Sequence, residues 1–264
     1  MSFTNKSPSE TYKDLLYVDN SNSGVDSTKR SIKSGSGASS SLSLNDRGAL
    51  IKSSTDNTTA FDVQNSGGTS KLLVDTTNNY VKANGVFVNT QYAFFGIGKS
   101  DATGFLADTH YPLPFTSTPL GSSATEDDVI FGTGTEPATT FTTGTTNATL
   151  SSSLVSKMWY VPDNISIDGV TSLEGADAAT GDTTRMHLYS YTFTSGSTSC
   201  LASGLLLAHN NDVTNAGSEQ AYLSTWTVDS ASVASGKVIL AFFRQDDANS
   251  DYSATVSIKY HLTG

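Results

Sequence analysis

The stretch SGGTSKLLVDTTNNYVKANG, residues 66–85, predicts a short strand, a polar turn and a second short strand. Its apolar side chains recur at every second position, as at Leu72 and Val74, which is the period of a strand with one apolar face. Two or three apolar residues per strand bury too little surface to offset the entropy of ordering an isolated hairpin. The hairpin must therefore pack against further protein, and copies of the same chain are the partners we favour.

Similar strand signals recur throughout residues 31–95, separated by turn-rich segments. We predict that this region is a β-hairpin stalk, closed by three chains around an axis so that no loose strand edge remains at the interface. The residues expected in the trimer core of this stalk are Phe61, Val63, Leu72 and Val74. The alternative is a monomer in which these strands join the sheet of the C-terminal region.

Residues 1–30 contain one apolar cluster between polar flanks, Leu15, Leu16, Tyr17 and Val18. An apolar cluster at a terminus, with no core of its own nearby, is typical of a segment that docks on a larger surface. We interpret residues 1–30 as an attachment segment, and a frayed end with a local cluster is the alternative.

The third region, residues 96–264, has the apolar residues to build its own core. Twenty of the twenty-five aromatic residues lie beyond residue 86. Candidate strands such as TTRMHLYSYTF and KVILAFFRQ alternate with turns rich in Gly, Asn and Asp. The spacing predicts a jelly-roll-like antiparallel β-sandwich, so the whole chain is expected to be all-β.

The acidic composition argues against nucleic acids and anionic membranes as binding partners. The formal net charge is −10, and residues 85–264 hold six Lys and Arg against seventeen Asp and Glu, a net charge of −11. Such a surface does not suit nucleic acid or an anionic membrane, because phosphates are bound by clustered Lys and Arg. The sequence contains no apolar run of membrane-spanning length, and with Cys200 as its only cysteine it forms no intrachain disulfide.

No motif predicts catalysis or a cofactor. The four histidines, His110, His187, His209 and His261, show no metal-binding spacing, and we interpret His187, in an apolar strand, as a satisfied core residue. FFGIGKS, residues 94–100, lacks the first glycine of a phosphate-binding loop, and no nucleophile elbow surrounds a serine. We therefore expect no enzyme activity and no cofactor.

Two further segments have residues that could bind a ligand, although a purely structural role explains each of them as well. Asp247, Asn249 and Asp251 imitate the start of a calcium loop, but Tyr252 and Ile258 stand where Gly and Glu are required, so a solvated turn is the main interpretation and a weak calcium site the alternative. Trp159 and Tyr160 could stack on a glycan, although a tryptophan in an apolar strand is more often a core residue.

The segments SETYKDLLYVDNSNSGVDSTKR, AFDVQNSGGTSKLLVDTTNNYVKANG and WYVPDNISIDGV, with SDYSATVSIKYHL, resemble those of virion fibre and decoration proteins of marine tailed bacteriophages. The resemblance implies a homotrimer with an N-terminal virion-attachment part, a β stalk and a distal head, made in the bacterial cytoplasm and located at the virion surface. A capsid decoration protein or head fibre, attached to other virion proteins, is the leading hypothesis. The alternative is a tail fibre or receptor-binding protein whose head binds host glycan.

Overall fold

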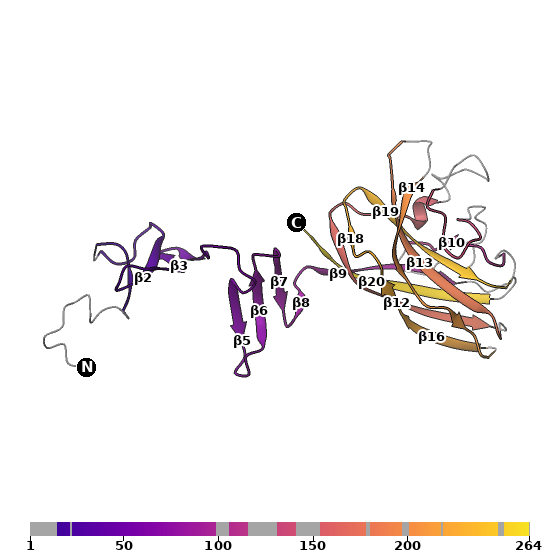
Figure 1. Ribbon diagram of the computed structural model, residues 1–264, viewed down its shortest axis with the longest axis horizontal. Helices are drawn as coiled ribbons and strands as arrows, with labels where there is room; N and C mark the ends of the chain where they lie inside the picture. The colour runs from indigo at the N-terminus through magenta and orange to yellow at the C-terminus, as the bar shows by residue number, and fades with distance from the viewer. Residues whose placement is uncertain are drawn as a thin grey trace. The chain divides into compact units, whose positions relative to one another are not determined.

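The computed structural model describes residues 15–21, 23–98, 106–115, 131–140, 154–177, 180–196, 201–217, 219–247 and 251–263. The chain divides into two compact units, Met1–Val88 and Asn89–Gly264 (Figure 1). Within these described ranges the regular structure is antiparallel strand, apart from a short 3-10 turn at Val155–Lys157. The all-β fold class predicted from the sequence is confirmed.

The N-terminal unit contains two separate four-stranded antiparallel sheets, each a simple meander in which every strand pairs with the next. The strands of the first sheet are β1 (Leu16–Val18), β2 (Arg30–Ser34), β3 (Ser39–Asn45) and β4 (Gly48–Ile51). The strands of the second are β5 (Phe61–Gln64), β6 (Ser70–Asp75), β7 (Tyr80–Ala83) and β8 (Val86–Phe87). Tight turns join the second set, with Asn84 and Gly85 both at positive φ between β7 and β8. An Asn-Gly pair is the preferred sequence for such a two-residue hairpin loop.

The C-terminal unit, called the head below, is a sandwich of two antiparallel sheets (Figure 1). One sheet has the order β16-β12-β20-β9, with β18 paired to β12; the other has the order β10-β19-β13-β14-β17, with β11 paired to β19 and β15 to β13. The main strands are β9 (Thr90–Gly98), β12 (Ile165–Asp177), β13 (Thr183–Thr192), β14 (Ala202–His209), β16 (Glu219–Thr225), β19 (Lys237–Gln245) and β20 (Asp251–Leu262). The short strands are β10 (Tyr111–Pro112), β11 (Trp159–Tyr160), β15 (Val213–Thr214), β17 (Thr227–Val228) and β18 (Ser232–Val233).

Most consecutive long strands of the head change sheets, as in jelly-roll folds: β12 is followed by β13 in the opposite sheet, and β19 by β20, whereas β13 and β14 pair within one sheet. Alternation along each strand sends every second side chain into the layer between the sheets. Phe95, Val170, Met186 and Val256 meet there in one large apolar core. The predicted antiparallel β-sandwich head is thereby confirmed.

A second apolar cluster lies on the opposite face of the β19–β13 pair. It contains Tyr189, Tyr191 and Phe242 from these strands, covered by Phe131 and Leu154. The segment 131–140 is fixed across this face by hydrogen bonds from the Tyr191 hydroxyl to the Ala138 carbonyl (2.8 Å) and from the Gly204 amide to the Thr139 carbonyl (2.7 Å). The head therefore has an extra covering layer on its larger sheet.

Two of the expected boundaries differ from the structure. The stalk was expected to reach residue 95, but β9 begins at Thr90 and pairs with β20, so the head starts after Val88. Residues 1–30 were expected to form a separate attachment segment, but Leu16, Tyr17 and Val18 pair with Ser34, Lys33 and Ile32. The apolar cluster at residues 15–18 is thus part of the first sheet.

Candidate assembly surface

One face of the β5–β8 sheet is apolar and is left open to solvent. In the register of this sheet Phe61 lies opposite Val74, and Val63 opposite Leu72. Residues opposite each other in an antiparallel pair share a face, so the four residues predicted to form a stalk core do lie on one face of one sheet. β7 and β8 extend this face through Val81, Ala83 and Val86.

These apolar side chains are not covered. Val63 is 44% exposed and Leu72 is 37% exposed, while Phe61 and Val74 are half-buried. Across the described residues 15–21 and 23–88, no apolar side chain is buried, and Asp75 alone is. The described part of the N-terminal unit thus has paired antiparallel strands but no hydrophobic core, which is the usual source of folding free energy.

The reverse face of the β5–β8 sheet mixes charged residues with Leu73, Tyr80 and Phe87, and several of these side chains contact one another. The Lys82 ammonium lies 4.5 Å from the Tyr80 ring centroid and 4.4 Å from that of Phe87, and the two rings meet edge to face. Cation–π contacts of this kind are suited to a solvated surface. Asp75 accepts hydrogen bonds from the backbone and the side-chain amide of Asn78, both at 2.8 Å. The side chains of the reverse face thus make hydrogen bonds and cation–π contacts with one another, which the side chains of Phe61, Val63, Leu72 and Val74 cannot do.

The β1–β4 sheet has a similar face, although Arg30, opposite Leu44, and Ser34, opposite Leu16, interrupt its apolar residues. Val18 lies opposite Ile32, Leu42 opposite Ile51, and Leu44 opposite Ala49. Strand alternation places Leu16 on the same face, where it is 71% exposed. Half of the predicted attachment cluster, Leu16 and Val18, therefore belongs to an apolar sheet face. Leu15 precedes the strand and Tyr17 points to the reverse face, and both are exposed.

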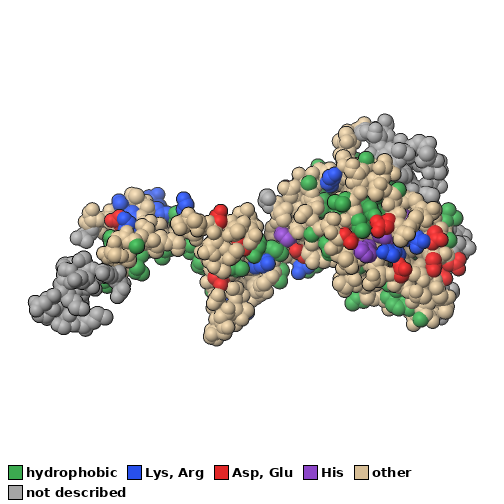
Figure 2. Space-filling model, in the orientation of Figure 1, with side chains coloured by type: hydrophobic (Ala, Val, Ile, Leu, Met, Phe, Trp, Pro, Cys, Tyr) green, Lys and Arg blue, Asp and Glu red, His purple; other side chains and the backbone are tan. Residues whose placement is uncertain are grey.

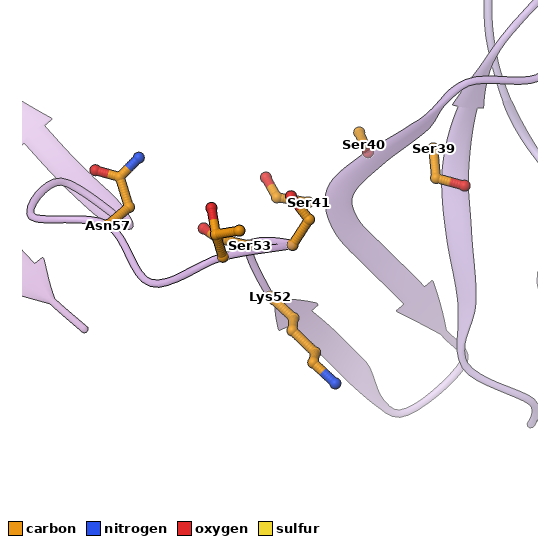
Figure 3. Close-up of a pocket in the computed structure, with 8 residues that line it drawn as sticks. Ser39, Ser40, Ser41, Lys52, Ser53 and Asn57 are labelled. Carbon is orange, nitrogen blue, oxygen red and sulfur yellow. The ribbon is translucent and has the colours of Figure 1, made fainter. Parts of the chain in front are cut away.

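A polar cavity of about 460 Å³ lies beside the end of the first sheet (Figure 3). Hydroxyl groups of Ser39, Ser40 and Ser53 line it, together with Asn57. Figure 3 shows the Lys52 side chain directed away from these serines. Lys52 is the one ionisable residue of this lining, and the other residues offer neutral hydroxyl and amide groups without an acid or an apolar wall.

Two histidines that are far apart in the sequence, His110 and His187, lie side by side in the head. The His110 and His187 rings lie 5.2 Å apart, and both side chains are fully buried. Burial lowers the pKa of His110 to about 4 and that of His187 to about 3, so both rings are neutral near pH 7. His110 Nε2 lies 3.0 Å from the Gly134 carbonyl oxygen.

His187 is a core residue as predicted, but it is not satisfied: neither of its ring nitrogens has a hydrogen-bond partner. His209 and His261 lie apart from this pair, 2.8 Å from Asp229 and 2.9 Å from Asp168 respectively. The described residues contain no group of three or more His, Cys, Asp or Glu side chains that could hold a metal ion.

The predicted glycan-contact pair is divided by the structure. Trp159 is only 7% exposed, and its indole stacks on Phe115 inside the sandwich, so it is a core residue and the prediction of a glycan contact there is wrong. Tyr160, the next residue along the strand, is 53% exposed and meets Phe193 edge to face. An exposed aromatic pair therefore remains at this position.

The calcium-loop candidate falls mostly outside the described residues. Asn249 is not described, nor is the side chain of Asp251, the first residue of β20. Asp247 follows β19. No described helix is long and apolar enough to cross a membrane.

The groups that the structure brings together are thus apolar faces rather than a reactive centre. Sequence reasoning located the face of the second sheet, because strand alternation is visible at Phe61, Val63, Leu72 and Val74. It missed the equivalent face of the first sheet, whose apolar residues are scattered among serines. A comparison with protein-family models and with curated proteins finds no match to this chain.

Proposed function

We propose that this chain is a non-enzymatic structural protein of a bacteriophage virion that assembles as a homotrimer through the sheets β1–β4 and β5–β8. The observation that carries the proposal is the missing core of the N-terminal unit. Two four-stranded sheets present apolar faces to solvent, and none of their described apolar side chains is buried. Sheets of this kind gain stability when a second protein surface covers the apolar face.

Copies of the same chain are the simplest source of that surface. A closed ring of three identical chains covers three equivalent faces at once and leaves none over. The meanders also have open edge strands, β5 and β8 in the second sheet, which chains in a closed ring can shield. A β unit of two successive meanders, without a core in its described residues and followed by a well-packed head, suits a stalk between an attachment point and the head.

Attachment to the virion is assigned to the N-terminal end, where Leu15 and Tyr17 are exposed apolar residues outside the apolar face of the β1–β4 sheet. The acidic head then faces solvent at the virion surface. This arrangement matches a capsid decoration protein or head fibre, which is the function we favour, and the resemblance of the sequence to such proteins supports it.

A second candidate is a tail fibre or receptor-binding protein. The exposed Tyr160 beside Phe193 supports it, since aromatic rings stack on the apolar faces of sugars. In this case the head contacts host glycan and the N-terminal end joins the tail.

Immunogold labelling of intact virions separates the two candidates. We expect antibody against the head to label the capsid shell at many positions. Label restricted to the tail would overturn the assignment to the shell and support the tail fibre, and virions without label would contradict both.

A further inference from the structure

The segment 131–140, called the covering segment below, is held in place beside a pair of buried histidines. We propose that it is an acid-sensitive latch: protonation of His110 and His187 releases the segment from the head while the sandwich beneath it stays folded. Release uncovers the aromatic rings of Tyr191 and Phe242, which pack against Phe131. The latch lies within the head and does not depend on the assembly of the stalk.

His110 fixes the first half of the covering segment. Its backbone amide donates to the Gly132 carbonyl (3.1 Å), and its carbonyl accepts from the Phe131 amide (3.0 Å). Its ring Nε2 lies 3.0 Å from the Gly134 carbonyl oxygen. A carbonyl oxygen only accepts, so Nε2 carries the proton of the neutral ring and Nδ1 is bare. Any displacement of the His110 ring therefore disturbs the covering segment directly.

The second half of the covering segment is fixed by hydrogen bonds to the sheet, from Tyr189 to Glu136, from Tyr191 to the Ala138 carbonyl and from the Gly204 amide to the Thr139 carbonyl. Residues 131–140 form no strand and no helix of their own. The strands beneath them, β13 and β19, pair continuously from Thr184 to Thr192 and carry the main core on their other face. The segment can therefore detach at a lower free-energy cost than these strands can separate.

The histidine pair tolerates only neutral rings. The ring centroids lie 5.2 Å apart and both side chains are fully buried. Among the described residues, His110 Nδ1 and both ring nitrogens of His187 have no hydrogen-bond partner. A proton added to either ring creates a buried N–H donor without an acceptor, and a second proton places two like charges side by side. Protonation therefore favours a state in which water reaches the rings.

The surroundings of the pair also oppose protonation. Burial, and to a smaller extent the nearby arginines, lower the pKa of His110 to about 4 and that of His187 to about 3. Figure 2 shows acidic, basic and histidine side chains close together on one area of the head surface. The titratable and charged groups around the pair are Arg185 and Tyr189 on β13, Arg244 on β19 with its partner Asp108, His209 on β14 with its partner Asp229, Asp212 beside Arg185, and Glu136 on the covering segment.

The sign of the pH dependence follows from these pKa values. In the released state water solvates the rings and each histidine regains its ordinary pKa of 6.5. Below pH 6.5 the released state binds protons that the closed state does not, so the equilibrium constant for release rises by up to about tenfold per pH unit for each histidine. Above pH 6.5 both states carry neutral rings, and the latch stays closed.

Hydrogen–deuterium exchange of the full-length protein, followed by mass spectrometry from about pH 7 to about pH 4, measures the release. The reporter is the Gly204 amide, whose hydrogen bond to Thr139 exists only in the closed state, and the amides of the β13–β19 ladder are the reference. After correction for the intrinsic exchange rate, we expect the Gly204 amide to lose protection as the pH falls while the ladder amides still exchange much more slowly. Equal opening constants for reporter and ladder at every pH would overturn the latch, because exchange would then require unfolding of the whole head.

Three variants assign the acid sensitivity to the pair. His110→Gln combined with His187→Phe removes both titrating rings, and the glutamine amide retains a donor for the Gly134 carbonyl. His209→Gln is the matched control on the same sheet, and Glu136→Gln removes the one carboxylate of the covering segment. We expect the opening constant at Gly204 to become independent of pH in the double variant and to keep its slope in both other variants.

The slope is compared rather than the absolute opening constant, because it does not depend on how well the new side chains pack. An unchanged slope in the double variant would overturn the assignment to His110 and His187. Loss of the slope in Glu136→Gln or His209→Gln would overturn it as well, since the acid response would then belong to that group.

Discussion

Val63 lies directly opposite Leu72 in the β5–β6 ladder, and both apolar side chains are more than one third exposed. The two side chains are aligned on one face of the sheet, as in a hydrophobic core, but no other part of the described chain covers them. Phe61 and Val74 form the next pair on the same face. In a trimer, each of these residues occurs three times around the axis, so one substitution changes the interface three times.

Leu72→Asp is expected to dissociate the assembly while the head stays folded. Three carboxylates would enter apolar surroundings, where desolvation and mutual repulsion oppose ionisation, at a cost on the order of several kcal/mol per trimer. Sedimentation velocity would show monomers or loosened trimers, with β-sheet circular dichroism retained. Leu73→Asp is the matched control, since Leu73 points to the reverse face, where it lies opposite Lys82, and its substitution should preserve the assembly. Equal effects of the two substitutions would refute the assignment of the apolar face.

Gly204→Ala is expected to destabilise the head. A Cβ atom at Gly204 would lie 2.8 Å from the Thr139 Cα and 2.8 Å from a ring carbon of Tyr191, so the covering segment would have to move. Overpacking of this kind costs about 1–3 kcal/mol. The melting temperature of the head should fall by several degrees, whereas Gly169→Ala, where the added Cβ meets nothing within 4 Å, should have a smaller effect. A similar loss in both variants would argue against the close approach at Gly204.

The stability of the head should fall as the pH drops from about 6.5 toward 4. Burial lowers the pKa of His187 to about 3, so below pH 6.5 the unfolded chain binds a proton that the folded head does not. Each such histidine makes the free energy of unfolding decrease by up to about 1.4 kcal/mol per pH unit in this window. His110, with a pKa of about 4, adds to the slope.

His187→Phe removes one of these protons and should flatten the dependence of unfolding free energy on pH. Denaturant unfolding at a series of pH values measures the slope, which does not depend on how well the new ring packs. Arg185, Arg244 and Glu136 remain around the site in both proteins. A slope identical to that of the wild type would show that His187 is not kept neutral by the fold.

Glu174 gives the opposite pH dependence. Its buried carboxylate accepts hydrogen bonds from Thr184 Oγ1 (2.6 Å), Ser224 Oγ (3.0 Å) and Asn210 Nδ2 (3.4 Å), yet burial raises its pKa. Because the folded head binds the proton more tightly than the unfolded chain, this residue's contribution to stability is lost as the pH rises from about 4.5 through the raised pKa.

Glu174→Gln should therefore gain stability relative to the wild type as the pH increases through this window. Glu174→Leu should be destabilised at every pH, because it removes an acceptor from the buried Thr184 and Asn210 side chains, at about 1–3 kcal/mol for a buried group that is left unpaired. Thermal denaturation of both variants at several pH values tests this. Equal stability of the Leu and Gln variants would contradict the role of the hydrogen bonds.

Local patterns in the sequence predicted a large part of this fold. Alternation at Phe61, Val63, Leu72 and Val74 correctly placed four residues on one face, and the long apolar strands of the C-terminal region correctly predicted a sandwich. The position of Val18 was harder to predict because its partner Ile32 is separated from it by a polar loop. The close approach of His110 to His187 depends on long-range strand pairing, which local periodicity does not encode.

The sequence also did not determine which of two neighbouring residues in a strand faces the core. Trp159 and Tyr160 are neighbours in β11, and which of them faces the core depends on the pairing of β11 with β19. A shift of one residue would exchange the two side chains. Trp159 faces inward in the actual register, so only Tyr160 stays available to solvent.

The central claim is that the coreless N-terminal sheets are covered by other copies of the chain. The mass of the full-length protein in solution, measured by mass photometry or sedimentation equilibrium, tests it most directly. We predict a single species of about three times the chain mass of 27.7 kDa. A folded species of 27.7 kDa that persists at all concentrations would contradict the claim.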